Sequence, residues 1–216
     1  MSWNSEGHMD PETKNRDEGA PSVWTPANIV TCVRIVFIPV FMVLAELSCI
    51  QAGALYDPVL APAACILYIL LSLTDKLDGY LARSRNEITD FGKFLDPIAD
   101  KLLVFSALLI LLEQEFVGVW VVFIILLREF LVSALRMVAG AKGVVIAADT
   151  LGKWKTAVTM IALCGYFIAI AIASVGGVYP AAYLVIAAHV LIILAVVLTV
   201  VSGVQYFWNG RDVIFS

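Results

Sequence analysis

Charged residues are scarce in this chain of 216 residues. Asp, Glu, Lys and Arg together make up 15% of it, whereas they make up about a quarter of a typical soluble domain. Hydrophobic residues reach 61%. This balance excludes an ordinary soluble domain, because so large an apolar share needs lipid as well as a protein core to cover it. The composition therefore predicts an integral membrane protein.

Several chemical signatures are also missing. The four cysteines (Cys32, Cys49, Cys65 and Cys164) are scattered without any Cys-x2-Cys or Cys/His spacing, so we expect neither a disulfide framework nor a zinc site. The sequence has no Gly-rich phosphate loop, no Ser/His/Asp arrangement and no nucleic-acid motif. No nucleic-acid partner is expected, and any catalysis has to come from other residues.

Six apolar stretches are long enough to cross a bilayer as helices. They run approximately over residues 29–47, 58–75, 94–112, 117–138, 155–174 and 180–207. The predicted fold class is all-α: an integral membrane protein with six transmembrane helices, forming one membrane domain over residues 25–216.

Lys and Arg are absent from three predicted connections, 48–57, 113–116 and 175–179. The basic residues that accompany the other helix ends are Lys76, Arg83, Arg85, Lys93, Arg136, Lys142, Lys153, Lys155 and Arg211. Because short cytosolic loops carry the excess of Lys and Arg, we expect both termini in the cytosol. The cytoplasmic (inner) membrane of a bacterium is the expected location.

Residues 1–24 differ in composition from the rest. They hold five acidic residues against Lys14 and Arg16, without a basic start followed by an apolar core. We therefore predict a disordered acidic tail with no assignable task, and not a secretory signal.

Four aspartates lie where the second and third apolar stretches meet the cytosol. Asp75 and Asp78 are three residues apart, and Asp96 and Asp100 are four apart, so each pair shares one helix face. Four carboxylates in so apolar a segment repel one another and lose hydration, and a divalent cation is the simplest compensation. Hard oxygen ligands select Mg²⁺, Mn²⁺ or Ca²⁺. Two such ions about 3.5–4 Å apart can hold a diphosphate.

Small residues beside these aspartates leave room for a ligand. Gly79 removes a side chain from the helix surface, Ala82 is small, and Arg83 can donate to a phosphate. The alternative reading of Gly79 and of Gly92 is that they only mark a helix–loop–helix turn.

A second polar group follows in the sequence, made of Arg128, Arg136, Lys153 and Lys155, which we call the basic cluster. Arg128 and Arg136 are eight residues apart, close to two helical turns, so they lie on roughly one face. Lys153 and Lys155 open the fifth apolar stretch, where a helix N-terminus also favours an anion. The alternative is that these four residues are ordinary anchors on the cytosolic side.

The aspartate segment resembles the signature of the CDP-alcohol phosphotransferases, membrane enzymes of phospholipid synthesis. All eight fixed positions of the signature match, in the order Asp75-x2-Asp78-Gly79-x2-Ala82-Arg83-x8-Gly92-x3-Asp96-x3-Asp100. Three other segments are similar to the branch of that family that uses sn-glycerol 3-phosphate: Asn28-x2-Thr31-x2-Arg34, Arg128-Glu129-Phe130 with Ser133-Ala134-Leu135-Arg136, and 151–156. One departure is Ala27, where members of the family usually carry Pro.

The resemblance implies transfer of a phosphatidyl group from CDP-diacylglycerol to sn-glycerol 3-phosphate by a homodimeric membrane enzyme. It implies two Mg²⁺ (or Mn²⁺) ions, held by Asp75, Asp78, Asp96 and Asp100, and it makes Asp100 the general base as well. The residues implied for the CDP-lipid are Asn28, Thr31, Asp78, Gly79, Ala82, Arg83 and Gly92. The basic cluster would bind the phosphate of the acceptor.

Two other functions remain open from the residues. A sibling transferase with another acceptor, such as inositol phosphate, would keep both the aspartates and the basic cluster. A cation transporter would need its carboxylates near the middle of the membrane on broken helices. The clustering of all four aspartates at one end disfavours that alternative.

Overall fold

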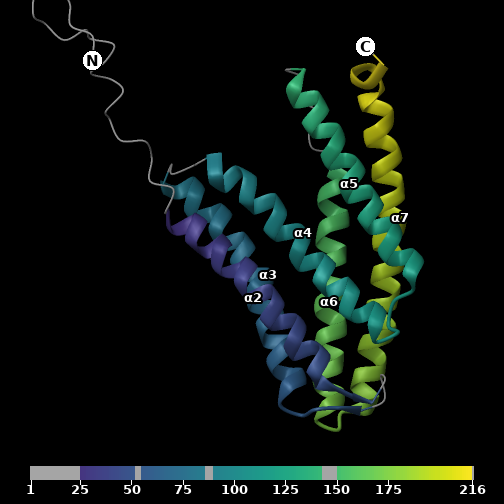
Figure 1. Cartoon of the computed structure of the whole chain (residues 1–216). Coiled ribbons are helices and arrows are strands. Elements are labelled where there is room, and N and C mark those ends of the chain that lie inside the picture. The colour runs from purple at the N-terminus through teal and green to yellow at the C-terminus, as the bar shows by residue number, and fades with distance from the viewer. Residues whose placement is uncertain (1–24, 52–54, 86–89, 143–149, 216) are drawn as a thin grey trace, which may run out of the picture.

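The computed structural model describes residues 25–51, 55–85, 90–142 and 150–215. The predicted acidic tail, residues 1–24, lies outside the described residues. Within the described part, six helices dominate: α2 (Pro26–Ser48), α3 (Leu60–Arg85), α4 (Asp90–Glu113), α5 (Val119–Ala141), α6 (Thr150–Ser174) and α7 (Val178–Phe215) (Figure 1). Each predicted apolar stretch falls on one of these helices, so the all-α prediction is confirmed.

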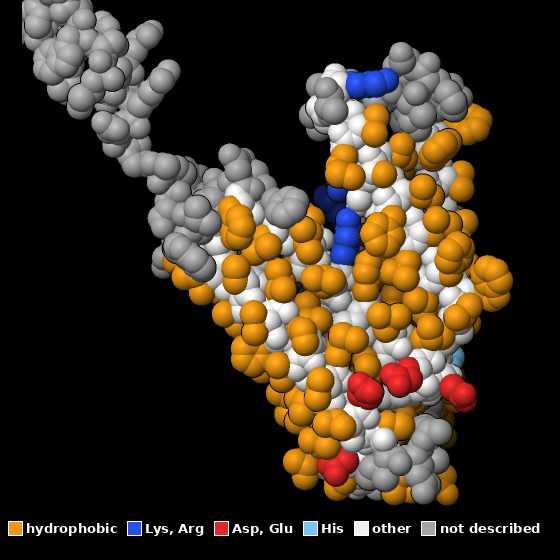
Figure 2. Space-filling model, in the orientation of Figure 1, with side chains coloured by type: hydrophobic (Ala, Val, Ile, Leu, Met, Phe, Trp, Pro, Cys, Tyr) orange, Lys and Arg blue, Asp and Glu red, His pale blue; other side chains and the backbone are white. Residues whose placement is uncertain are grey.

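Three helical segments of the described chain are long and apolar enough to cross a membrane: Asn28–Ser48, Thr150–Ser174 and Val178–Trp208. A shorter apolar helix covers Leu60–Thr74. Large hydrophobic side chains are exposed along the outer faces of the helices, as Figure 2 shows for one side of the molecule. These features belong to a membrane protein, because lipid is the solvent that such faces require. The count of six spans and the side on which each end lies remain predictions.

The first helix begins with a regular cap. Thr25 Oγ1 accepts a hydrogen bond from the backbone N–H of Asn28 at 3.3 Å, and Pro26 occupies the first turn, where its missing N–H costs nothing. Pro26 therefore starts the helix one position before Ala27, so the departure from the family pattern leaves this helix start intact.

A short antiparallel pair of strands, β1 (Cys49–Gln51) and β2 (Leu55–Tyr56), joins α2 to α3 and was not predicted. Asp57 then caps the start of α3, because its Oδ1 accepts the backbone N–H groups of Leu60 and Val59, each at 2.8 Å. These two hydrogen bonds lower the pKa of Asp57, and the one from Leu60 has the larger effect.

The interior joins α2, α3 and α6 through three aromatic rings. The ring centroids of Phe41, Tyr68 and Phe167 lie 4.8–5.2 Å apart. Such aromatic pairs contribute about 0.5–1.5 kcal/mol each beyond the burial of their area. This contact fixes α2 and α3 against α6, and α6 in turn packs along α7.

Helix α2 also organises the helices that carry the aspartates. It packs along both α3 and α4, whereas the described residues of α3 and α4 make little direct contact with each other. In Figure 1, α2 and α3 lean away from α5 and α7 toward the end opposite the β1–β2 pair. Lys and Arg side chains lie in the hollow between these two groups of helices on the face shown in Figure 2.

Candidate active site

Two of the four aspartates are described in full. Asp96 and Asp100 lie one turn apart on α4, with Asp96 half-buried and the side chain of Asp100 48% exposed. Asp75 and Asp78 lie in the second half of α3, as do three predicted CDP-lipid residues, Gly79, Ala82 and Arg83. The side chains of that segment lie outside the described part of the structure.

Helix α2 contacts both described aspartates with polar side chains. Thr31 Oγ1 donates to Asp96 Oδ1 at 2.8 Å, and Arg34 Nη1 donates to Asp100 Oδ1 at 2.9 Å. Thr31 and Arg34 are both fully buried. Thr31 therefore lies where its hydroxyl fixes an aspartate, and its contact with a CDP-lipid stays a prediction.

The two remaining predicted CDP-lipid residues lie at the same end of the helices. Asn28 is buried one turn before Thr31 on α2, and Gly92 is buried in the first turn of α4. Their location is compatible with a ligand near Asp96, and their role in binding a CDP-lipid stays a prediction.

The donor chemistry fits a hard divalent cation. Asp96 and Asp100 supply carboxylate oxygens on one face of α4, which is the ligand type that Mg²⁺ and Mn²⁺ prefer. Among the described side chains no group of three or more His, Cys, Asp or Glu lies together, and Asp75 and Asp78 belong to the segment left out of that set. The described residues thus supply two of the four predicted ligands.

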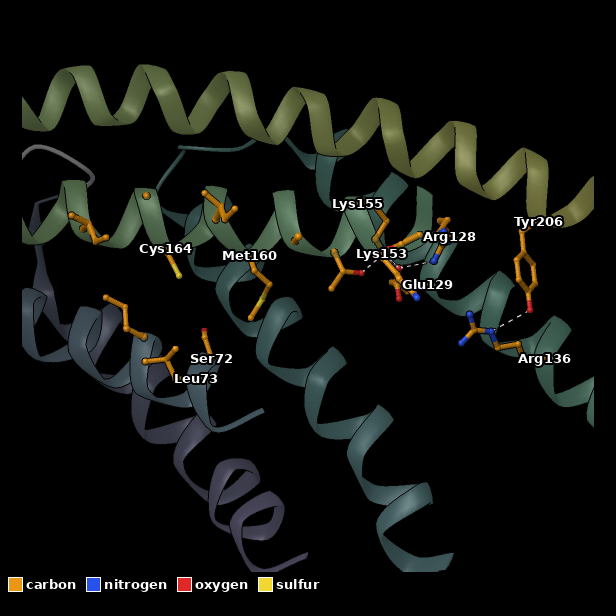
Figure 3. Close-up of a pocket in the computed structure, with 17 residues that line it drawn as sticks. Ser72, Leu73, Arg128, Glu129, Arg136, Lys153, Lys155, Met160, Cys164 and Tyr206 are labelled. Carbon is orange, nitrogen blue, oxygen red and sulfur yellow. Dashed lines mark hydrogen bonds and ion pairs between the residues drawn. The ribbon is translucent and has the colours of Figure 1, made fainter. Parts of the chain in front are cut away.

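All four residues of the basic cluster line one cavity. It has a volume of about 830 Å³ and lies between α3, α5, α6 and the C-terminal part of α7. In Figure 3 the cations gather toward one end of this cavity, while Ser72, Leu73, Met160 and Cys164 lie toward the other. The cavity therefore combines a cationic end with a largely apolar end.

Glu129 holds two of these cations. Its Oε1 accepts hydrogen bonds from Lys155 Nζ and, at 3.2 Å, from Arg128 Nη1. The side chains are only 6%, 13% and 19% exposed for Lys155, Arg128 and Glu129 respectively. One carboxylate thus compensates two mostly buried cations, and the group keeps a net positive charge toward the cavity.

Helix α7 fixes the two arginines from the other side. Arg128 Nη2 donates to Ser202 Oγ at 3.2 Å, and Arg136 Nε donates to Tyr206 Oη at 3.1 Å. The guanidinium of Arg136 also lies 5.6 Å from the centroid of the Tyr206 ring, within the range of a cation–π contact. Arginines held in this way are poor candidates for simple anchors at the membrane surface.

A second cavity of about 350 Å³ lies between Asp100 and part of the basic cluster. Asp100 and Lys101 line it together with Glu129, Arg136 and Lys155, and these last three also line the larger cavity. Lys101, which follows Asp100, donates to Ser133 Oγ on α5. Asp100 and two residues of the basic cluster, Arg136 and Lys155, therefore line a common space.

Sequence reasoning missed four residues of this site. Arg34 was visible only as the last member of the Asn28-x2-Thr31-x2-Arg34 spacing, and Glu129 only as the neighbour of Arg128. Ser202 and Tyr206 are four apart and so share a face of α7, but they stand in an apolar run without any charge to draw attention.

These features define a helical membrane protein whose site sets paired carboxylates beside a cavity lined by cations. The family model described as CDP-alcohol phosphatidyltransferase matches residues 24–202. The chain belongs to this family, whose members are transferases of phospholipid biosynthesis and generally use a divalent metal. The resemblance seen in the aspartate signature is confirmed.

Three similar proteins illustrate the relationship. A "CDP-diacylglycerol–glycerol-3-phosphate 3-phosphatidyltransferase" of Bacillus subtilis is 45% identical over 140 residues, covering 63% of this chain and 72% of the relative. A protein of the same name from Rickettsia bellii is 36% identical over 180 residues, or 83% of this chain and 92% of its own length. A "Probable phosphatidylglycerophosphate synthase" of Mycobacterium tuberculosis is 36% identical over 204 residues, or 94% and 90%.

Proposed function

We propose that this protein transfers the phosphatidyl group of CDP-diacylglycerol to sn-glycerol 3-phosphate, giving phosphatidylglycerophosphate and CMP. The observation that carries the proposal is the shared wall of the two cavities: Arg136 and Lys155 of the basic cluster line the larger cavity and also line the smaller one together with Asp100. A phosphorylated acceptor needs both a cradle of cations and a nearby proton acceptor. The names of the Bacillus subtilis and Rickettsia bellii relatives contain the same acceptor.

The acceptor phosphate would bind to the basic cluster. Arg128 and Arg136 are fixed by Ser202 and Tyr206, so their guanidinium groups are oriented before a ligand arrives. Lys153 is exposed on the cavity wall and supplies a further cation. Because Glu129 neutralises only part of this charge, the cavity favours an anion with nearly two negative charges over a neutral alcohol.

Asp100 would act as the general base. It takes the proton of the acceptor hydroxyl, whose oxygen forms a bond to the β-phosphorus of the CDP-lipid while the bond from that phosphorus to the CMP oxygen breaks. Asp75, Asp78, Asp96 and Asp100 are the proposed ligands of two Mg²⁺ (or Mn²⁺) ions. Bound there, the ions would neutralise the diphosphate and so stabilise the charge that develops on the leaving CMP.

The membrane setting completes the proposal. All six helices would span the cytoplasmic membrane, with both termini and the site at the cytosolic face, and the enzyme would work as a homodimer. The CDP-lipid would lie along Asn28, Thr31 and Gly92, with Asp78, Gly79, Ala82 and Arg83 on the facing helix.

CMP release tests the function. Purified protein receives CDP-diacylglycerol and Mg²⁺ with sn-glycerol 3-phosphate, inositol phosphate or no acceptor. We expect CMP only with sn-glycerol 3-phosphate and none after the metal is removed by a chelator. Release with inositol phosphate alone would keep the transfer chemistry and reject the acceptor. Silence with both, in folded protein, would contradict the proposal.

The role of Asp100 has its own test. Asp100→Asn keeps the size of the side chain and its ability to accept a hydrogen bond from Arg34, but removes the basic carboxylate. Loss of general base catalysis alone costs about 10²- to 10⁴-fold. We expect kcat to fall by at least that factor in protein that still folds and inserts. Activity within tenfold of the unchanged protein would remove Asp100 from this role.

A further inference from the structure

Arg34 joins the two helices that carry the aspartates. Its Nη1 donates to Asp100 Oδ1 on α4 at 2.9 Å, and its Nε donates to Thr74 Oγ1 on α3 at 3.3 Å. Thr74 directly precedes Asp75 in the chain. One guanidinium on α2 thus contacts the two helix segments whose aspartates form the proposed metal site.

The hydrogen bonds around Arg34 have a defined direction. The hydroxyl of Thr74 donates to the backbone carbonyl of Leu71 at 2.7 Å, which directs an oxygen lone pair toward Arg34. Arg34 is 1% exposed, whereas the Asp100 side chain is 48% exposed. The cation is therefore locked in the protein interior, while the carboxylate that it holds reaches the open space where a ligand binds.

The packing of the helices gives this bridge its importance. Among the described residues α3 and α4 make little direct contact, and each packs along α2 instead. The relative position of the two aspartate pairs is consequently set through α2. Thr31, one turn before Arg34, repeats the arrangement with Asp96 at 2.8 Å.

We propose that Arg34 is a positioning residue, whose planar fork fixes Asp100 relative to α3 so that the two aspartate pairs can bind metal together. This inference rests on the proposed metal site. It adds a residue that acts through Asp100, and it gives a reason for an arginine at this position. A lysine carries the same charge but cannot place two N–H donors in a fixed plane.

The direction of the change in metal affinity tests this role. If Arg34 acted only by its positive charge, it would repel a metal cation, and Arg34→Gln would tighten metal binding. If Arg34 positions Asp100, Arg34→Gln weakens metal binding, as the loss of a group that orients a ligand does, by about 10- to 100-fold. Arg34→Lys separates the two cases, because it keeps the charge and loses the fork. Positioning predicts weaker binding for Arg34→Lys as well.

The measurement is Mn²⁺ affinity of the purified protein in detergent without substrates, followed by the electron paramagnetic resonance signal of free Mn²⁺. Thr74→Val removes one of the two described anchors of Arg34 without changing the charge, and we expect a smaller loss of Mn²⁺ affinity in the same direction. Steady-state rates give a second readout: kcat falls with Arg34→Lys, while the KM for sn-glycerol 3-phosphate stays within about twofold. Thermal unfolding of each variant identifies protein that is not folded.

Unchanged or tighter Mn²⁺ binding in folded Arg34→Lys and Arg34→Gln would overturn the inference. A parallel loss of folded protein, with normal Mn²⁺ affinity in the fraction that remains folded, would also reject it in favour of a purely structural role. If the unchanged protein releases no CMP, the proposed function fails, and the Mn²⁺ comparison still decides whether Arg34 positions Asp100.

Discussion

At the scale of single residues, Lys153 and Lys155 show how two neighbouring cations divide their tasks. Lys155 is buried against Glu129, whereas Lys153 is exposed on the cavity wall. Lys153 is therefore the cation of the cluster that can be removed with the least damage to the fold. Its contribution should appear in the binding of the acceptor.

We expect Lys153→Ala to raise the KM for sn-glycerol 3-phosphate about tenfold, because a hydrogen bond to a charged group contributes about 1.5–3 kcal/mol. The KM for CDP-diacylglycerol should change by less than about twofold. Lys142→Ala is the matched control, since Lys142 is exposed beyond α5 and is not among the described residues that line the cavity. Equal increases in both KM values would assign Lys153 a structural role.

Glu129 should stabilise the fold through its ion pairs with Arg128 and Lys155. Glu129→Gln leaves Arg128 and Lys155 mostly buried without their carboxylate, and breaking a buried ion pair costs about 3–5 kcal/mol. Because the Glu129 side chain is 19% exposed, we expect the free energy of unfolding to fall by about 3 kcal/mol, the lower end of that range. The loss should appear as a lower Tm in detergent. Glu113→Gln, at the exposed end of α4, should leave Tm unchanged.

The acceptor should partly repair the Glu129→Gln variant. A bound phosphate supplies the missing negative charge, so sn-glycerol 3-phosphate should raise the Tm of Glu129→Gln more than that of the unchanged protein. An equal rise in both proteins would mean that the phosphate binds away from Arg128 and Lys155.

At the scale of the elements, the positions of the helices could be predicted and their full lengths could not. Apolar runs near 20 residues are a strong signal, so each predicted stretch falls on a helix. Helix α7 continues to Phe215, beyond the predicted apolar stretch, through polar residues such as Asn209 and Arg211. Hydrophobicity marks only the part of a helix that lies within lipid, so it could not show where this helix ends. The β1–β2 pair is too short to carry a periodic pattern.

In the site, too, groupings within one helix could be predicted and contacts between helices could not. Spacing along one helix grouped Asp96 with Asp100 and Arg128 with Arg136, because helical periodicity relates residues a few positions apart. The contact between Arg34 and Asp100 joins residues 66 apart, and that between Arg128 and Ser202 joins residues 74 apart. Such pairs depend on how helices pack, which no local pattern encodes.

Helix packing around Arg128 depends on a glycine of α7. A Cβ added at Gly203 would lie 3.2 Å from Arg128 Cγ, so Gly203→Ala should push the Arg128 side chain from its place between α5 and α7. We expect a several-fold higher KM for sn-glycerol 3-phosphate and a lower Tm. Gly140→Ala on α5 is the control, because a Cβ there meets nothing within 4 Å and alanine favours the helix by about 1 kcal/mol. Similar behaviour of both variants would show that α7 yields without effect on Arg128.

At the scale of the whole molecule, the Lys and Arg side chains gather toward one end of the helices (Figure 2). On the face shown in Figure 2, acidic side chains lie toward the end with the β1–β2 pair, and Lys and Arg lie toward the opposite end. The described site residues Asp100, Arg136 and Lys155 line cavities at that second end. The positive-inside rule then predicts a cytosolic site.

Thiol labelling in intact bacterial cells tests this orientation. In a variant whose four native cysteines are replaced by serine, Glu113→Cys marks the acidic end of α4 and Lys142→Cys marks the end of α5 beside the site. A membrane-impermeant maleimide should label Glu113→Cys in intact cells and Lys142→Cys only after permeabilisation. Both positions are exposed, so a difference in labelling reports the side of the membrane and not burial within the protein. The reverse pattern would place the basic cluster outside the cell, and it would overturn the cytosolic site while leaving the family assignment unchanged.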